Sequence, residues 1–283
     1  IYNAEEVINL GQRLKNNNIK VIYEVVNIDN ILYARVKGDT REVRKIKFLQ
    51  QKALKVADYI LCRSEIDRRH ILDMGIDSGK ISMYRGAIKV DGITFKVRKR
   101  PNYKLVFLGH MYYPPNENAL KLIADKILPE LKKINKKYSI TILGLTPRNI
   151  INKYKKKGII FKNGIEDLSG ELLKYDLAIT PLMDGSGTRL KILDYLASGL
   201  PFITTDIGIE GLHKKISNYL IIENNIYNYA RRIDKIMNDL EGYGNISIGG
   251  RRFIERHYDW KNNLKPFINI YKKYEQKPKT RFD

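Results

Sequence analysis

The order of apolar and polar positions alternates between two periods along the first third of the chain. Apolar residues recur three times at helical spacing, and each time a short β-branched run follows. The pattern predicts helices over 4–17, 41–57 and 64–75, and strands over 19–26, 58–63 and 80–86. Ser64 is placed to cap the third helix and Gly75 to end it. Helices that alternate with strands in this way predict parallel strands covered by helices.

Residues 86–102 interrupt this alternation with glycine, proline and charged residues, and they indicate an interdomain linker. After it the alternation restarts. The expected strands cover 103–109, 138–144, 158–164, 176–182, 201–205 and 219–223, and the expected helices cover 116–135, 147–157, 167–175 and 188–198, with a helical tail over 225–275. The sequence therefore predicts an α/β fold with two Rossmann-like domains. A crevice between the carboxyl ends of the two sheets is the expected ligand site.

Composition narrows the class of protein. A chain of 283 residues with 43 % hydrophobic and 29 % charged residues suits two folded domains. No window approaches the roughly 18 consecutive apolar residues of a membrane span. The single cysteine, Cys62, excludes an internal disulfide and fits a reducing compartment, and the four scattered histidines form no zinc-type cluster.

The chain carries a strong positive charge, with 52 Lys and Arg against 31 Asp and Glu, or a net charge of +21. Such a balance favours anionic partners: nucleic acid, acidic lipid or phosphorylated ligands. The abundance of Lys, Asn, Ile and Tyr, whose codons are A/T-rich, is an equally good explanation of many of these lysines.

A glycine loop between a strand and a helix carries the most informative chemistry. Gly185, Ser186, Gly187 and Thr188 lie at the expected start of the helix, where free backbone N–H groups and the helix dipole favour a phosphate. Arg189 and Lys191 add cations suited to a diphosphate, and Asp194 can accept hydrogen bonds from sugar hydroxyls. The alternative is a tight turn with a solvated basic helix. The loop matches neither the P-loop nor the G-x-G-x-x-G pattern.

Two further stretches place glycines at the same end of the expected sheet. Gly109 ends the first strand of the second half, and Gly164 and Ile165 follow the third. Beside Gly109, packing of the loop explains Tyr112 and Tyr113 and helix capping explains Asn116.

The ordered set of motifs resembles the GT-B-fold glycosyltransferases of family 4, group 1. The matching segments are LGHMYYPPNENAL, ITILG, FKNGIEDL, YDLAITPLMDGSGTRLKILDYLASGLPFITTDIGIEGL and FIERHYDW. The resemblance covers residues 103–275 closely and 1–95 loosely. It implies a donor-binding domain over 96–258, and a last segment, 259–283, that crosses back to the first domain with Trp260 packed at the crossing.

The resemblance also implies the reaction: transfer of a hexose-type sugar from a nucleoside diphosphate sugar to a glycan or lipid-linked acceptor, with retention and without metal or other cofactor. No D-x-D pair is present to carry a divalent cation. Arg189 and Lys191 are the expected catalytic residues, because they can stabilise the departing diphosphate. The implied donor-binding set is Gly109, Gly164, Ile165, Gly185, Ser186, Gly187, Thr188, Arg189, Lys191 and Asp194. Asp194 keeps the carboxylate for the ribose, whereas Ser186 replaces a glutamate common in the family.

The first domain, residues 1–95, is expected to be partial, because the family pattern places a strand and a glycine loop before Ile1 and a histidine near Val26. The basic helix over 41–55 can lie on anionic lipid or be a solvated face. The resemblance places the protein in the cytoplasm, including the inner face of the membrane, in polysaccharide and cell-envelope synthesis. Two alternatives stay open: a GT-B-like module that binds a nucleotide sugar without catalysis, and a basic nucleic-acid-binding protein. The latter lacks any RRM, KH or helix-turn-helix signature, so nucleic acid is not an expected partner.

Overall fold

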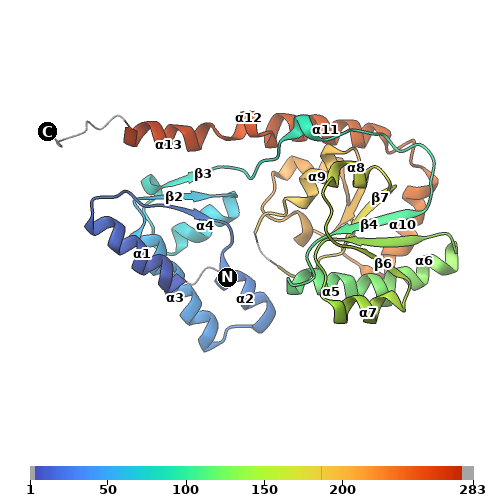
Figure 1. The fold of residues 1–283 in the computed structure, drawn as a ribbon, viewed down its shortest axis with the longest axis horizontal. Coiled ribbons are helices and arrows are strands. Elements are labelled where there is room, and N and C mark those ends of the chain that lie inside the picture. Colours follow the sequence, from blue (N-terminus) through green and yellow to red (C-terminus); the bar gives the residue numbers. More distant parts are fainter. Residues whose placement is uncertain (1–3, 186, 276–283) are drawn as a thin grey trace. The chain divides into compact units, whose positions relative to one another are not determined.

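The computed structural model describes residues 4–185 and 187–275, which divide into two compact units (Figure 1). The first unit holds the residues up to Ala87, residues 187 and 188, and the tail from His257. The second unit holds Ile88–Gly185 and Arg189–Arg256. The sequence alone placed the boundary between the first two domains at residues 95 and 96.

The first unit contains a small parallel sheet with strand order β1-β2-β3. Its strands are β1 (Ile22–Val25), β2 (Tyr59–Cys62) and β3 (Ile81–Met83), and its helices before the tail are α1 (Ala4–Asn16), α2 (Asp29–Lys37), α3 (Arg41–Val56) and α4 (Glu65–Asp73). Ile60, Cys62, Leu54 and Ile71 are buried together in the core. Ser64 caps α4, as predicted, because its side chain accepts a hydrogen bond from the Asp67 N–H at 3.0 Å. Helix α2 was not predicted from the sequence.

The second unit is built on six parallel strands. They are β4 (Lys104–Leu108), β5 (Ser139–Leu143), β6 (Ile159–Lys162), β7 (Leu177–Thr180), β8 (Phe202–Thr204) and β9 (Ile221–Ile222). Their spatial order is β6-β5-β4-β7-β8-β9, the order of a doubly wound nucleotide-binding sheet. The chain reverses direction across the sheet between β4 and β7, and ligands bind outside the carboxyl ends of the strands at such a point. The predicted α/β fold with parallel strands is confirmed.

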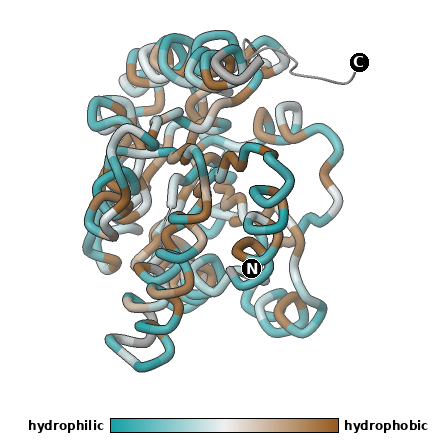
Figure 2. Tube along the Cα trace, turned by 90° about the vertical axis from the view of Figure 1, so that its left-hand side faces the viewer, coloured by the Kyte–Doolittle hydropathy of each residue, from teal (hydrophilic) through white to brown (hydrophobic). Residues whose placement is uncertain are grey.

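Helices cover both faces of this sheet (Figure 1). They are α5 (Pro114–Leu122), which continues through a π-helical turn (Ile123–Ile127) into α6 (Leu128–Ile134), then α7 (Arg148–Lys155), α8 (Leu168–Leu172), α9 (Lys191–Ala197), α10 (Tyr229–Asn238) and α11 (Gly244–Tyr258). Short 3-10 turns lie at Ser78–Lys80, Val90–Gly92, Ile207–Ile209, Lys214–Tyr219 and Ile226–Asn228. One core joins the sheet to α5, α6, α7 and α10 through Phe107, Leu120, Leu131, Tyr154 and Ile233. Figure 2 shows the hydropathy of each residue along the chain: hydrophilic and hydrophobic residues alternate along the helices.

The segment from Ile88 to Asn102 is held firmly to the second unit, although its sequence indicated a linker. The buried Arg98 guanidinium donates hydrogen bonds to four backbone carbonyls, at Leu172 (2.9 Å), Tyr175 (3.1 Å), Ser198 (2.7 Å) and Lys96 (2.5 Å). Two of these carbonyls belong to the ends of α8 and α9, where helices leave carbonyls without a partner of their own. Burial lowers the pKa of Arg98 to about 10, which still leaves it charged at neutral pH.

The tail continues from α11 into α12 (Trp260–Asn263) and α13 (Lys265–Glu275), with Asp259 as the cap of α12. The Trp260 indole donates a hydrogen bond from Nε1 to the Ala87 carbonyl at 3.0 Å. Its side chain is nevertheless 49 % exposed. The predicted apolar anchor is therefore fixed at its edge by a hydrogen bond and is not buried.

Candidate functional site

A cavity of about 780 Å³ opens at the carboxyl edge of the larger sheet, within the second unit. Its wall is formed by the segments that follow β4, β5 and β6 and by the start of α9. The lining residues are Leu108, Gly109, His110, Tyr113, Asn116, Gly144, Leu145, Gly164, Ile165, Leu168, Arg189, Leu190, Lys191 and Asp194. The cavity has the size typical of small-molecule sites and lies where the strand order reverses.

Two glycines let the ends of β4 and β5 approach closely. The Gly109 N–H donates a hydrogen bond to the Leu143 carbonyl at 2.8 Å. A Cβ atom at Gly109 would lie only 2.8 Å from Nδ2 of Asn116. Gly144 has a φ of +126°, and a Cβ there would lie 2.7 Å from the Gly109 carbonyl oxygen. Side chains at these positions would collide with Asn116 and with the backbone of Gly109, so the close approach requires glycine at both.

Asn116 connects the loop after β4 to the start of α9. It is the third residue of α5, which begins at Pro114, so Asn116 does not cap this helix as the sequence suggested. Its Nδ2 donates to the His110 carbonyl at 3.0 Å, and its Oδ1 accepts from Nζ of Lys191 at 3.1 Å. The Lys191 ammonium also lies 4.2 Å from the centre of the Phe107 ring. The position of this cation is thereby fixed from two sides.

Arg189 places a second cation at the same site. Its side chain is only 7 % exposed, and its guanidinium packs against Gly185, where a Cβ atom would collide with Nη2. Burial, together with the positive charge of Arg189, lowers the pKa of Lys191 to about 7. Arg189 stays protonated at any physiological pH. The cavity therefore holds one permanent cation and one whose charge depends on pH and on what is bound.

Asp194 supplies the carboxylate of the site. It follows Lys191 by three residues on α9, so the two side chains project from the same side of the helix. Burial raises the pKa of Asp194 to about 6. Between pH 6 and 7, Asp194 is thus mostly ionised while Lys191 still holds much of its proton. An acceptor for hydroxyl groups and two donors for anions coexist in this window.

The structure brings six of the predicted donor-binding residues together at the cavity. These are Gly109, Gly164, Ile165, Arg189, Lys191 and Asp194. Gly185 lies behind the Arg189 guanidinium, while Gly187 and Thr188 group with the first unit. Ser186 lies outside the described residues.

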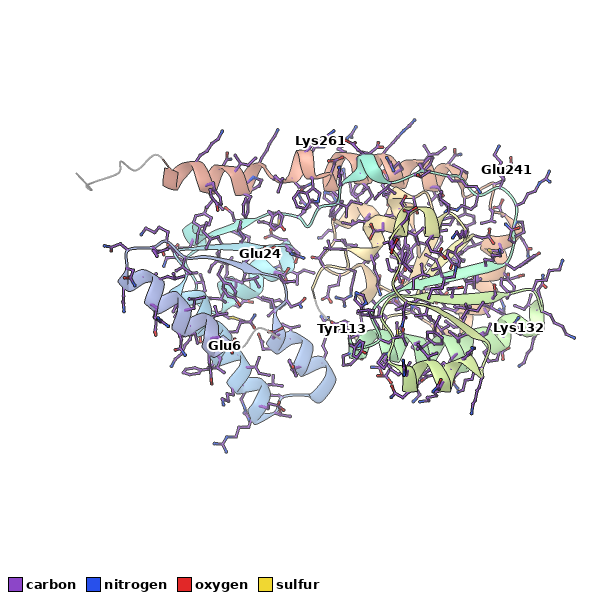
Figure 3. The ribbon with its side chains drawn as sticks, in the orientation of Figure 1. Glu6, Glu24, Tyr113, Lys132, Glu241 and Lys261 are labelled. Carbon is purple, nitrogen blue, oxygen red and sulfur yellow. The ribbon has the colours of Figure 1, made fainter. Side chains whose placement is uncertain are left out.

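The helix after this loop starts later than predicted, at Lys191 instead of residue 188. Gly185 and Gly187 have φ values of +121° and +77°, which keep the loop non-helical up to residue 187 and agree with a start no earlier than 188. The sequence analysis also missed His110, Tyr113, Gly144 and Leu145 as lining residues. Tyr113, labelled in Figure 3, precedes α5 and lines the cavity, whereas Tyr112 is exposed. Gly144 and His110 lie directly after or close to the ends of the parallel strands β5 and β4, and this position in the sequence could have indicated them.

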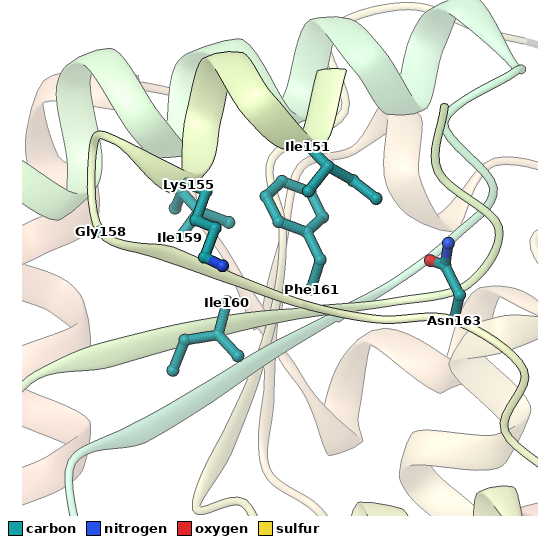
Figure 4. Close-up of a pocket in the computed structure, with 7 residues that line it drawn as sticks. All are labelled: Ile151, Lys155, Gly158, Ile159, Ile160, Phe161 and Asn163. Carbon is teal, nitrogen blue, oxygen red and sulfur yellow. The ribbon is translucent and has the colours of Figure 1, made fainter. Parts of the chain in front are cut away.

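A second hollow, of about 550 Å³, lies beside the edge strand β6 (Figure 4). Its lining residues are Ile151, Lys155, Gly158, Ile159, Ile160, Phe161 and Asn163. Lys155 is the one titratable group among them, so this hollow has no convergent set of charges. Within the residues that the structure describes, no three His, Cys, Asp or Glu side chains cluster as metal ligands, and no helix is long and apolar enough to cross a membrane.

Comparison with known proteins agrees with this geometry. Residues 102–239, about half of the chain, match the family model of the glycosyl transferases group 1. A protein of Klebsiella pneumoniae, described as an uncharacterized 44.6 kDa protein in the cps region, is 30 % identical over 181 residues. That match covers 60 % of this chain and 46 % of the relative, so the chain spans about half the length of the curated protein that it matches.

Solved structures share the fold over almost the whole chain. Anabaena HepE in complex with UDP and glucose superposes with a TM-score of 0.72 at 9 % identity, over 97 % of this chain and 76 % of HepE. Sucrose-phosphate synthase from Thermosynechococcus elongatus gives a TM-score of 0.75 at 12 % identity, over 95 % of this chain and 71 % of the synthase. The resemblance inferred from the sequence motifs is confirmed: residues 102–239 match the glycosyl transferases group 1, and the chain has the GT-B fold.

Proposed function

We propose that this chain transfers a sugar from a nucleoside diphosphate sugar, and that the cavity in the second unit is its donor site. The observation that carries the proposal is the pair of cations, Arg189 and Lys191, fixed beside one another with Asp194 at the carboxyl edge of the sheet. Two neighbouring cations repel each other, and a diphosphate offsets that repulsion with two negative charges.

The same residues suit the chemistry of transfer. When the bond between the sugar C1 and the diphosphate oxygen breaks, the electron pair stays on that oxygen, and negative charge builds up on the diphosphate. Cations that are already in place stabilise this charge more in the transition state than in the ground state. Arg189 and Lys191 take this role, and Asp194 accepts hydrogen bonds from the ribose hydroxyls.

The finer features of the reaction belong to the same proposal. The transferred group is a hexose-type sugar, its anomeric configuration is retained, and no metal ion or other cofactor takes part. The acceptor is a glycan or a lipid-linked molecule in polysaccharide synthesis. The Klebsiella relative is described by its cps region, which supports polysaccharide synthesis, and the HepE structure contains UDP and glucose, which supports a hexose donor.

The test is a thermal-shift screen of the wild-type chain against UDP-, GDP-, ADP- and CMP-sugars. A ligand at 100 times its Kd stabilises the folded protein by about 2.7 kcal/mol. The active donor is then assayed for sugar release to water and for transfer to glycan acceptors. Arg189→Ala should lower turnover by about 10²–10³-fold, the cost of losing one donor to a developing anion.

Arg231→Ala, which removes the same group from an exposed position on α10, is the matched control and should leave turnover unchanged. Failure of every nucleotide sugar to stabilise the chain would overturn the proposal. Binding without any turnover would instead identify a module that holds the donor without catalysis.

A further inference from the structure

The exposed side of α3 carries a continuous basic stripe. Its members are Arg41, Arg44, Lys45, Phe48, Lys52 and Lys55, all of them exposed. Successive residues of an α-helix are turned by about 100°, so these six positions fall within an arc of about 100°. Val43, Gln50, Ala53 and Leu54 are buried on the opposite side of the helix. Five cations and one aromatic ring therefore form one surface, which we call the α3 stripe.

Phe48 lies in the middle of the stripe and is 53 % exposed. Nζ of Lys52 lies 4.5 Å from the centre of its ring. An exposed apolar ring is stabilised when it leaves water for an apolar medium. A bilayer with anionic headgroups offers such a medium directly beneath a surface that attracts the surrounding cations. Arg44 is in addition 3.9 Å from the exposed Asp39, a separation at which such a pair contributes little.

The fold holds this surface outward. Thr40 caps α3 by accepting a hydrogen bond from the Val43 N–H at 3.2 Å. On the inner side, Nε2 of Gln50 donates to the Asn27 carbonyl at 3.1 Å, and Nε2 of Gln51 donates to the Met74 carbonyl at 2.7 Å. Near its end, α3 meets α1 at Gly11, where a Cβ atom would lie 2.5 Å from Cγ1 of Val56. The helix cannot turn its basic side inward without losing these contacts.

A dense run of basic residues does not by itself produce such a stripe. One other dense basic run, Lys153, Lys155, Lys156 and Lys157, lies at and just beyond the end of α7. Lys156 and Lys157 follow the last residue of α7, so the four lysines do not project from one face of the helix, and Lys157 is paired with Asp125. The run thus has a similar number of cations without a common face, and it serves as an internal comparison.

We propose that the α3 stripe docks the first unit on an anionic lipid bilayer, with its cations among the lipid phosphates and Phe48 inserted between the headgroups. The helix lies in the plane of the interface, as amphipathic helices with a basic polar face do. Attraction to the anionic surface acts on each cation that comes within a Debye length of it. This docking does not depend on the donor site in the second unit.

Vesicle co-sedimentation of the full chain tests the proposal. The chain should bind vesicles of phosphatidylglycerol and phosphatidylcholine, should not bind phosphatidylcholine alone, and should be released by high salt. Replacing Arg41, Lys45 and Lys52 with Gln should lower the partition coefficient by about 100-fold, or about fivefold for each cation. Replacing Lys153, Lys155 and Lys156 with Gln lowers the net charge equally and should change the coefficient by no more than about threefold.

Phe48 reports on insertion separately from charge. In a Trp260→Phe background, Phe48→Trp introduces a single indole, whose emission should shift to the blue and be quenched by brominated lipid. Phe48→Ser should weaken binding by about tenfold, the loss of one inserted aromatic ring. The far-ultraviolet circular dichroism and Tm of each variant confirm that it is folded.

Equal losses in the two triple variants would overturn the proposal, since they would show that net charge alone drives binding. An unquenched, water-exposed indole on bound vesicles would do so as well. Binding of duplex DNA or RNA with a higher affinity than anionic vesicles would assign the stripe to nucleic acid instead.

Discussion

Lys191 should make donor binding depend on pH above neutrality, with a sign and a size that follow from the site. In the free protein its pKa is lowered to about 7, because the ammonium is buried and lies near Arg189. A bound diphosphate brings two negative charges to this ammonium and raises its pKa towards the ordinary value of a lysine. Binding above pH 7 must therefore take up a proton, and affinity must fall as the pH rises.

The expected size can be worked out directly. Lys191 must be protonated before the diphosphate binds, so the apparent Kd is raised by the inverse of the protonated fraction. Well above the pKa, this factor grows tenfold per pH unit. Between pH 6.5 and 8.5 the Kd should rise by about 25-fold, or about 1.9 kcal/mol, if the bound-state pKa lies well above 8.5. Proton uptake should increase from about a quarter of a proton at pH 6.5 to about one proton at pH 8.5.

Isothermal titration calorimetry with a nucleotide sugar measures both quantities, provided that it is repeated in two buffers with different ionisation enthalpies. A nucleotide sugar is preferable to the free diphosphate, because its phosphates are diesters and do not titrate in this range. Lys191→Arg keeps the cation but removes its titration, so its Kd should be nearly flat. In Arg189→Gln the repulsion is lost and the midpoint should lie above pH 7, still below the ordinary lysine value because burial remains.

Asp194 determines how donor binding depends on pH on the acidic side. Its pKa is raised to about 6 by burial, so protonation below pH 6 should remove an acceptor for the sugar hydroxyls and weaken binding again. Asp194→Asn should abolish this acidic limb and leave the alkaline one. A Kd that stays within twofold from pH 6.5 to 8.5, or the same slope in wild type and Lys191→Arg, would refute the role assigned to Lys191.

Three other predictions test neighbouring parts of the structure. Asn116→Ala should weaken nucleotide-sugar binding by about fivefold to tenfold, because Lys191 loses the oxygen that positions it, and Asn116→Asp should retain more affinity; equal losses would contradict this role. Arg98→Met should lower the free energy of unfolding in urea by about 3 kcal/mol, since it removes the hydrogen bonds that the guanidinium donates to the Tyr175, Leu172 and Ser198 carbonyls, whereas the exposed Arg100→Met should cost almost nothing. Exhaustive treatment with EDTA should leave sugar transfer unchanged, and restoration of lost activity by Mg²⁺ or Mn²⁺ would show that the cations need a metal partner.

The larger sheet could be predicted because its information is local. Runs such as 103–109 and 138–144 are mostly apolar, as strands buried on both faces are, and each ends in a glycine. Parallel strands that alternate with helices must bring those glycines to one edge, which is where Gly109, Gly144 and Gly164 line the cavity. The position of the site residues near this edge could therefore be predicted from the topology of the sheet as much as from the residue types.

The parts that could not be predicted depend on contacts between distant residues. Asn116 and Lys191 are 75 positions apart, and their hydrogen bond exists only once β4 and β7 are neighbours. Arg98 resembles the other basic residues of a polar segment until α8 and α9 present their terminal carbonyls to it. Helix α2 lacks a clear apolar face, so no periodicity indicated it.

The two pKa shifts of the site have a common origin that bears on its chemistry. Burial disfavours charge on any group, so it lowers the pKa of Lys191 and raises the pKa of Asp194. A lysine and an aspartate that formed an ion pair would each stabilise the charge of the other, and their pKa values would move apart instead of towards each other. The causes of the two shifts, to about 7 and about 6, include no opposite charge from the part of the chain that the structure describes. Their charges are left for a ligand that carries both an anion and hydroxyl groups, and a nucleotide sugar carries both.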